Sequence, residues 1–417
     1  MPIERNEFKM HQRIVQQTLL VLYFLLSHNG VEGQKKLSKL EDAELEKQLK
    51  SLNKPAVKTV KTKYGDTYDC VDFYKQRAFD HPLLKDHNFH PEMKPTLSRI
   101  NKDSTFSSAT NRSSTIWSKD GGCPFGTIHV KRITKDDLIR LRNMPPPEDV
   151  TFVDEYDISN NNSEPNGRYI SSQGYKVAIA QIPYNPNSKF AGAGMDTALY
   201  NPQVKGQQHS GSRLKIHKGS DILQVGWRVD PTLYGDTKTR FFIHFQAGKI
   251  HCFNTLCPGF VQVNYDLPLD NSFMDTISQR GGRPWGARMY IDRDLAGNWW
   301  VLVSQEFTQV GFWPQSLFTD LKSFATNVDW GGVVYSPPGV PEPPIGSSYF
   351  PIENSSYDAY CAGVIIFNEK GKTIEVDKTI THIDNPNMYK VEFIQLSYGA
   401  KDMYFVLYGG PGESTHV

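Results

Sequence analysis

The sequence has almost no net charge and no long hydrophobic segment. Its 46 Lys and Arg residues nearly balance its 45 Asp and Glu residues, so the formal net charge is +1 at pH 7. Because no basic block is present, we expect no nucleic-acid partner. The longest apolar run covers residues 18–26, about half of the ~20 residues that a membrane-spanning helix needs.

Several signatures of catalysis and cofactor binding are also absent. The chain has no G-x-S-x-G motif, no recognisable Cys–His pair and no phosphate-binding loop. GGRPWG at 281–286 is glycine-rich but lies in no strand–helix context, which indicates a loop. A zinc site at Cys252 and Cys257 would need two more ligands, and only His251 and the more distant His244 lie nearby. We therefore expect neither a metal nor another cofactor.

The N-terminus has the order of a secretory signal peptide. Basic residues within the first 13 positions precede the apolar run, and small residues follow it up to Gly33. This order predicts a signal peptide over residues 1–33 with cleavage after Gly33, and a membrane anchor is the alternative. We expect a secreted, extracellular protein with no membrane partner once the signal peptide is removed.

The stretch 221–334 holds the densest set of aromatic residues, glycines and turn signals. Alternating apolar residues predict short strands, each with one apolar face. Turn residues separate these strands at short intervals, which favours an antiparallel sandwich or barrel. The two clearest apolar faces are Phe241, Ile243 and Phe245 in the first strand and Trp299, Val301 and Val303 in the second.

Motifs along most of the chain carry a family resemblance. The C-terminal motifs are GWRVDPTLYGD, CFNTLCPGFVQV, GNWW, VGFWP, WGG, GSSYFP and YGGPG, and the upstream motifs are LNKPAVKTV, DCVDFYKQRAFDHPLLKDH and GCPFGTI. In this order the chain resembles the neprosin family of plant glutamic peptidases, and its upstream part resembles that family's activation peptide. The resemblance implies a mainly β protein, with an antiparallel β-sandwich as the C-terminal domain and a smaller α+β N-terminal pro-domain.

The domain boundaries follow from composition together with this resemblance. We predict a signal peptide at 1–33, an activation peptide or pro-domain at 34–142, a linker at 143–168 and a neprosin-type β-sandwich at 169–417. Three prolines at 145–147 stiffen the linker, and the polar residues after them suit an exposed, cleavable junction.

Three local features of the pro-domain can also be predicted. An amphipathic helix is expected over 37–53, and strand structure is expected over 57–73 and 127–133, with a polar loop at 101–115. His81, His87 and His90 lie close together in the sequence, which suggests the hypothesis that they gain charge near pH 6 and loosen the pro-segment. Ordinary surface histidines are the alternative.

The resemblance locates a catalytic pair that this chain lacks. Family members carry one glutamate just before the GW motif and one just after WGG, on facing strands. Two carboxyl groups in one cleft suit acid–base hydrolysis because their repulsion separates their pKa values. Here the two positions are Gln224 and Val333.

Gln224 keeps an amide that can donate to an oxyanion, and a related fungal class pairs glutamine with glutamate, but Val333 removes the second carboxylate. Losing a general base typically costs about 10²–10⁴ in rate. We therefore predict a catalytically impaired protein, a pseudoenzyme with a peptide-binding cleft.

An active enzyme with a relocated carboxylate is the alternative hypothesis. Asp329 lies four residues before Val333, an even offset that places it on the same face of a regular strand. Glu306 and Glu342 are further candidates without a positional argument. The chain would then be a glutamic endopeptidase that cleaves near proline, with a peptide or protein as its substrate.

The resemblance and the secretory prediction also bear on cysteine and asparagine. We predict disulfides between Cys70 and Cys123 and between Cys252 and Cys257, with Cys361 left over. Three sequons are candidate glycosylation sites, at Asn111, Asn161 and Asn354. A secreted member of a plant family would reach the apoplast or the vacuole, and its own pro-domain would be its first partner.

Overall fold

A computed structural model of the chain describes residues 39–96, 121–148, 151–154, 167–170, 173–398 and 401–413. The predicted signal peptide, the polar loop at 101–115 and the sequons at Asn111 and Asn161 lie outside these residues. Residues 1–48 and 49–417 form two compact units. In the described part of the chain, no helix combines the length and the apolar character that crossing a membrane requires.

Helix α2 and a three-stranded sheet make up most of the described pro-domain. Helix α2 (Lys39–Leu52) lies where a helix was predicted. The predicted strand stretch 57–73 is a hairpin of β1 (Ala56–Lys61) and β2 (Thr67–Asp72), because Gly65, with φ of 90°, turns the chain between them. Strand β3 (Thr127–Lys131) pairs with β2, and α3 (Lys135–Leu141) follows it.

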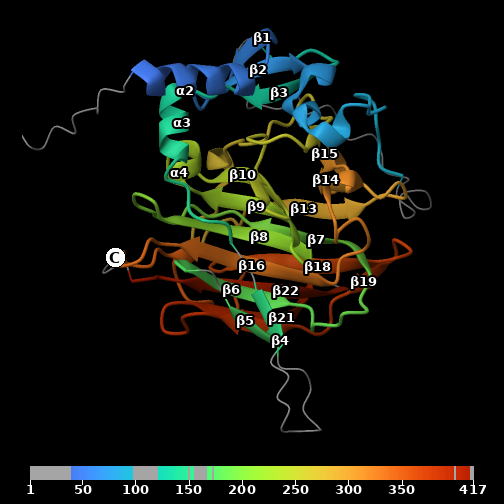
Figure 1. The fold of residues 1–417 in the computed structure, drawn as a ribbon. Coiled ribbons are helices and arrows are strands. Elements are labelled where there is room, and N and C mark those ends of the chain that lie inside the picture. The colour runs from blue at the N-terminus through green and yellow to red at the C-terminus, as the bar shows by residue number, and fades with distance from the viewer. Residues whose placement is uncertain are drawn as a thin grey trace, which may run out of the picture. The chain divides into compact units, whose positions relative to one another are not determined.

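Two large antiparallel sheets form the sandwich (Figure 1). The order of the seven-stranded sheet is β11 (Ile250–Phe253), β10 (Arg240–Ala247), β9 (Asp221–Val229), β8 (His209–Lys218), β16 (Asn327–Tyr335), β6 (Tyr175–Gln181) and β20 (Ile380–Ile383). The main order of the ten-stranded sheet is β12 (Val261–Gln262), β15 (Thr308–Trp313), β14 (Trp299–Val303), β13 (Gly286–Arg293), β7 (Phe190–Ala198), β18 (Ala359–Asn368), β22 (Lys401–Gly410) and β17 (Ile345–Gly346).

Shorter elements complete the described fold. Strand β19 (Thr373–Glu375) pairs with β18, and β21 (Lys390–Tyr398) pairs with β22. A separate hairpin pairs β4 (Thr151–Asp154) with β5 (Gly167–Ile170), and β5 runs past residue 168, the predicted end of the linker. The remaining elements are α4 (Pro231–Tyr234) and the 3₁₀ helices η1 (Phe73–Lys75), η2 (Arg77–Asp80), η3 (Pro82–Leu84), η4 (Met274–Thr276) and η5 (Gln315–Leu317).

The main core lies between the two sheets. Phe241, Ile243 and Phe245 of β10 and Trp299 and Val301 of β14 are buried in it, and Val303 packs against it partly buried. This confirms the apolar faces predicted from their alternation. Truncating a side chain of this size to Ala typically costs about 3–5 kcal/mol, so this core supplies much of the stability of the fold.

The pro-domain packs against the opposite face of β14. Trp300 and Leu302 are buried there in a second apolar cluster with Phe312, and the pro-domain residues Val71 and Ile128 belong to the same cluster. The sequence pattern showed one apolar face for this strand. The second face is covered as well because another part of the chain folds over it.

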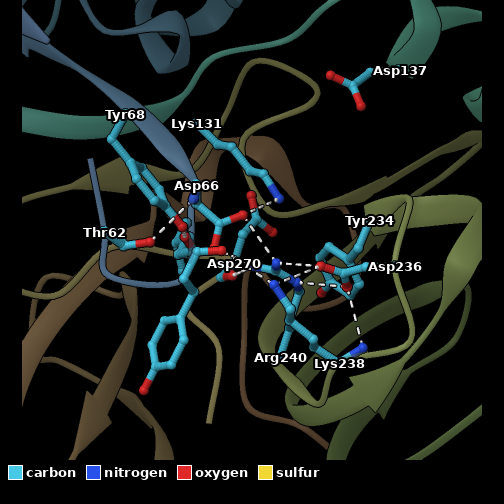
Figure 2. A network of polar contacts seen from close by, with 12 residues as sticks. Thr62, Asp66, Tyr68, Lys131, Asp137, Tyr234, Asp236, Lys238, Arg240 and Asp270 are labelled. Atoms are coloured by element: carbon cyan, nitrogen blue, oxygen red, sulfur yellow. Dashed lines mark hydrogen bonds and ion pairs between the residues drawn. The ribbon is translucent and has the colours of Figure 1, made fainter. Parts of the chain in front are cut away.

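An arginine at the end of β10 joins the sandwich to the pro-domain hairpin (Figure 2). Both terminal nitrogens of Arg240 donate to the Asp66 carboxylate, at 2.9 and 3.0 Å, and Arg240 also donates to Asp236 at 2.6 Å. Tyr68 donates its hydroxyl to the carbonyl of Leu269 at 3.0 Å. Because Arg240 is fully buried, these charge-assisted contacts anchor the hairpin strongly.

The histidine cluster of the pro-domain has a packing role. The His87 ring stacks on Phe79 at 3.6 Å and on Phe89 at 5.3 Å between ring centroids. Burial lowers the pKa of both His81 and His87 below the usual value. The hypothesis that these two histidines gain charge near pH 6 is therefore not supported, because their surroundings favour the neutral ring.

Candidate functional site

The candidate site lies on the outer face of the seven-stranded sheet, where β9, β8 and β16 run side by side (Figure 1). Lys215 of β8 lies opposite Gln224 of β9 on one side and opposite Asp329 of β16 on the other. Side chains alternate along a strand, so these three residues share a face with Arg213, two residues before Lys215. The core side chains Leu214 and Trp330 point to the other face.

Strand β16 stays regular through its two glycines. It pairs without a register shift with both β8 and β6 from Asp329 to Tyr335, so Asp329 and Val333 lie on the same face, as predicted for a regular strand. A Cβ atom at Gly331 would lie 2.4 Å from the Ala178 carbonyl oxygen, and its φ is 136°. Only glycine permits this approach of β16 to β6.

Both family positions line one pocket. Gln224 and Val333 come from strands β9 and β16 of the same sheet, with β8 between them. The other residues that line the pocket are Glu148, Tyr175, His209, Arg228, Phe242, His244 and Phe253. The sequence therefore identified two residues of this pocket. The family pair was expected on facing strands, whereas Gln224 and Val333 lie on strands of one sheet and line the same cavity.

Glu148, from the predicted linker, supplies a carboxylate that was not anticipated. Arg213 donates to both of its oxygens, from Nη2 to Oε1 at 2.5 Å and from Nε to Oε2 at 3.2 Å. Lys215 donates from Nζ to Oε1 at 3.3 Å, and Gln224 donates from Nε2 to Oε2 at 3.3 Å. A buried carboxylate thus lies within hydrogen-bond reach of the Gln224 amide.

The electrostatics of Glu148 favour the ionised form. Burial alone would raise its pKa, but Arg213 and Lys215 outweigh burial and hold the pKa well below its usual range. A carboxylate held this way is a weak base, and it does not carry a proton near neutral pH. Burial lowers the pKa of Lys215, against the opposing effect of Glu148 and Asp329.

Asp329 forms an ion pair with Arg213. Its Oδ1 accepts from Arg213 Nη1, and its Oδ2 lies 4.0 Å from Lys215 Nζ. Asp329 is buried and is not among the residues that line the pocket. Glu306 and Glu342 do not line it either, since Glu306 is exposed between β14 and β15 and Glu342 accepts from Asn385 Nδ2 at 2.9 Å. Through its contact with Nη1, Asp329 positions the guanidinium group of Arg213.

Two histidines in the pocket are neutral. Burial lowers the pKa of His209 to about 3, with Arg228 as the next cause, and burial also lowers the pKa of His244 to about 3. Arg228 donates to Asp230 at 2.6 Å, which neutralises its charge. The cations that bind the Glu148 carboxylate of the pocket are therefore Arg213 and Lys215.

The linker backbone also contacts the pocket wall. Tyr175 donates its hydroxyl to the carbonyl of Pro146 at 2.8 Å, and Pro145 and Glu148 are buried. Pro145 and Glu148 are buried because the chain lies against the sheet there. The exposed junction was predicted for the polar residues that follow, up to Arg168, and most of these lie outside the described residues.

The remaining predicted site residues fall elsewhere in the structure. Cys70 and Cys123 form a disulfide, and so do Cys252 and Cys257, which removes the two thiols that a zinc site would have needed. Cys361 is a buried free thiol. Asn354 is exposed in a loop, a position compatible with modification.

The sequence contained only a faint signal for Glu148. The acid follows three prolines directly, a segment stiff enough to present a side chain at a defined place. Its partner Arg213 lies 65 residues further along the chain. Strand alternation places Arg213 on a face but does not say which segment will lie against that face.

Fold and site together define a class of protein. A β-sandwich with a pocket lined by both positions of the expected catalytic pair, preceded by a smaller α+β segment, describes a peptidase-like protein with its activation peptide still attached.

A model of the neprosin domain matches residues 206–411, and a model of the neprosin activation peptide matches residues 59–181. The chain belongs to the neprosin family.

Two solved structures are similar to part of this chain. Scytalido-glutamic peptidase with a peptide-based transition-state analogue is 10% identical, with 56% of this chain and 97% of that chain covered and a TM-score of 0.32. SCP-B, a member of the Eqolisin family of peptidases in complex with the tripeptide Ala-Ile-His, is 8% identical, with 56% and 98% covered and a TM-score of 0.29.

Proposed function

We propose that this chain is a secreted, neprosin-like protein with impaired peptidase chemistry whose cleft holds extended, proline-containing polypeptide. One observation carries the proposal: Glu148 of the proline-rich linker lines the pocket that contains Gln224 and Val333, and Arg213 and Lys215 bind its carboxylate. This contact supports a cleft that holds such a segment without the pair of glutamates that would cut it.

The chemistry of the two substituted positions supports impairment. Val333 offers no proton acceptor, and Gln224 can donate a hydrogen bond but cannot deprotonate water. Glu148 is a weak base because Arg213 and Lys215 stabilise its charge. Each of the three groups nearest to the expected chemistry therefore lacks the property that a general base needs.

The test is cleavage of an unstructured, proline-rich protein by the purified chain from about pH 2.5 to 7. The natural chain is compared with the Gln224→Glu, Val333→Glu double variant. We expect no cleavage by the natural chain and measurable cleavage by the double variant, because the variant restores two carboxyl groups to one pocket. Cleavage by the natural chain that survives repeated purification would contradict the proposal.

A second candidate function has one specific observation in its favour. The 3.3 Å contact between Gln224 and Glu148 is a glutamine–glutamate pair, the composition that the related fungal class of peptidases carries. In that case the chain is an active endopeptidase, and Glu148→Gln abolishes cleavage while Asp329→Asn leaves a measurable rate. If the natural chain is active, this pair of variants decides which carboxylate acts.

A further inference from the structure

We infer that Arg213, Lys215 and Gln224 form a receptor for one acidic side chain of an extended polypeptide, a site that Glu148 of the chain's own linker occupies. The inference rests on the proposed function, because an active cleft would cut the segment that it binds. The inference adds the chemistry of the ligand, which is a carboxylate side chain on a proline-rich segment.

Within the described part of the chain, four hydrogen bonds reach the carboxylate of Glu148. Two come from the Arg213 guanidinium, one from Lys215 and one from Gln224, at 2.5 to 3.3 Å. Two parallel bonds from one guanidinium group suit the planar geometry of a carboxylate and add directional selectivity. Arg213 and Lys215 are fully buried, so this is a constructed site and not a chance surface pair.

The sandwich alone provides every donor. Arg213 and Lys215 lie on β8, and Gln224 lies on the adjacent strand β9. Asp329 of β16 holds the far side of the Arg213 guanidinium through Nη1. Because these strands pair with one another independently of the linker, the receptor keeps its geometry when the acid leaves.

Glu148 brings negative charge to two buried cations. Arg213 pairs with both Glu148 and Asp329, and Lys215 lies within reach of the same two carboxylates. Removing Glu148 takes one of these buried counter-charges away, which is strongly unfavourable until another anion replaces it.

The contacts of the linker also describe the ligand backbone. Tyr175 binds the carbonyl of Pro146, two residues before Glu148, and Pro145 is buried. A ligand that mimics this segment presents an extended chain with proline before its acid. Its acid enters the receptor while its backbone lies against Tyr175.

The first experiment is chemical rescue in the full chain. Glu148→Ala removes the atoms that acetate can replace, so we expect a lowered midpoint of thermal unfolding that sodium acetate raises with saturation. Acetamide and sodium chloride should not reproduce this rise, and Glu369→Ala, at an exposed acid, should respond to none of the three. If acetate and chloride raised the unfolding midpoint of Glu148→Ala equally, the proposed receptor site would be refuted.

The second experiment measures binding in trans. The Glu148→Ala chain is cut once within residues 155–166 by a site-specific protease and is then titrated with the peptides MPPPEDV and MPPPQDV. We expect the glutamate peptide to bind about 10- to 100-fold more tightly, as expected for hydrogen bonds to a charged group. Lys215→Gln should reduce this ratio. Equal affinity for the two peptides, or no binding of either, would refute the inference.

Mass spectrometry of the recovered peptides separates the two proposals. An intact peptide with a high glutamate preference supports both of them. A cut peptide with that preference overturns the proposed loss of catalysis and supports the receptor. An intact peptide without the preference overturns the receptor alone.

Discussion

The buried acids Glu148 and Asp270 have pKa values that are shifted in opposite directions. Glu148 is held ionised by Arg213 and Lys215, whereas burial raises the pKa of Asp270 to about 6 against the opposing effect of Lys131 and Arg240. At the scale of single residues, the direction of each pKa shift determines when each acid stabilises the fold.

Glu148→Gln should destabilise the chain by about 2–4 kcal/mol at pH 7, because the buried Arg213 and Lys215 lose their counter-charge. The folded pKa lies below the unfolded value, so this contribution is present above about pH 4.5 and is lost as the pH falls through the folded pKa. Chemical denaturation at several pH values measures it, with the exposed Glu369→Gln as the control. The difference should shrink as the pH falls below about 4.5, and one that stays constant down to about pH 3 or grows on acidification would contradict this prediction.

Asp270→Asn should have the opposite pH dependence. Stability from a raised pKa is fully present below the unfolded value of 3.8 and is lost as the pH rises through about 6. The gap between these values corresponds to about 3 kcal/mol, so the variant should gain about that much relative to the natural chain between about pH 4 and 8. Asparagine also tolerates the φ of 65° at this position.

Denaturation midpoints at about pH 4 and 8 test the effect of Asp270→Asn. Asp377→Asn is the control, since Asp377 is exposed. If the stability of Asp270→Asn relative to the natural chain did not change with pH, the assignment of a raised pKa to Asp270 would be wrong.

At the scale of elements, strand β16 carries both Asp329 and Val333 and depends on a glycine to lie close to β6. Gly331 has a φ of 136° and no room for a Cβ atom beside the Ala178 carbonyl. The regular register of this strand fixes which side chains reach the pocket.

Gly331→Ala should therefore destabilise the sandwich by about 2 kcal/mol or more, through contact with backbone in addition to strain. Gly339→Ala is the matched control, because Gly339 also has a positive φ, 79°, but nothing lies within 4 Å of its Cβ position. Thermal unfolding of both variants separates the two effects. Equal losses would show that strain alone, and not the approach of β6, accounts for the cost.

At the scale of the whole molecule, an apolar face and a buried arginine join the pro-domain hairpin to the sandwich. Trp300, Leu302 and Phe312 pack against Val71 and Ile128, and Arg240 binds Asp66. If no activity removes this segment, the isolated chain keeps it until another protease cuts the linker.

Asp66→Asn should weaken this docking by about 1.5–3 kcal/mol, since it removes the charge that faces buried Arg240. Amide hydrogen exchange should rise in β1, β2 and β3 and stay constant in β8 and β9. Asp80→Asn is the control because Asp80 forms a more exposed pair with Lys54, and such pairs contribute little. Similar exchange in both variants would argue against a docking role for Arg240.

The sequence by itself determined the features that depend on neighbours along the chain. Alternation placed Phe241, Ile243 and Phe245 on the core face, and an even offset placed Asp329 on the same face of its strand as Val333. The family motifs identified Gln224 and Val333 as positions that share a site. These features follow from strand periodicity and motif order, which a chain carries whatever it folds against.

Only the tertiary structure decided which distant segments meet. The second face of β14 is buried because the pro-domain covers it, and Glu148 is buried because its carboxylate reaches side chains of β8 and β9. An acid that follows three prolines is expected to be exposed to solvent. Glu148 can be buried in its ionised form because strand pairing brings together the donors of Arg213, Lys215 and Gln224. Such contacts depend on where the backbone returns in space, and no local pattern encodes that.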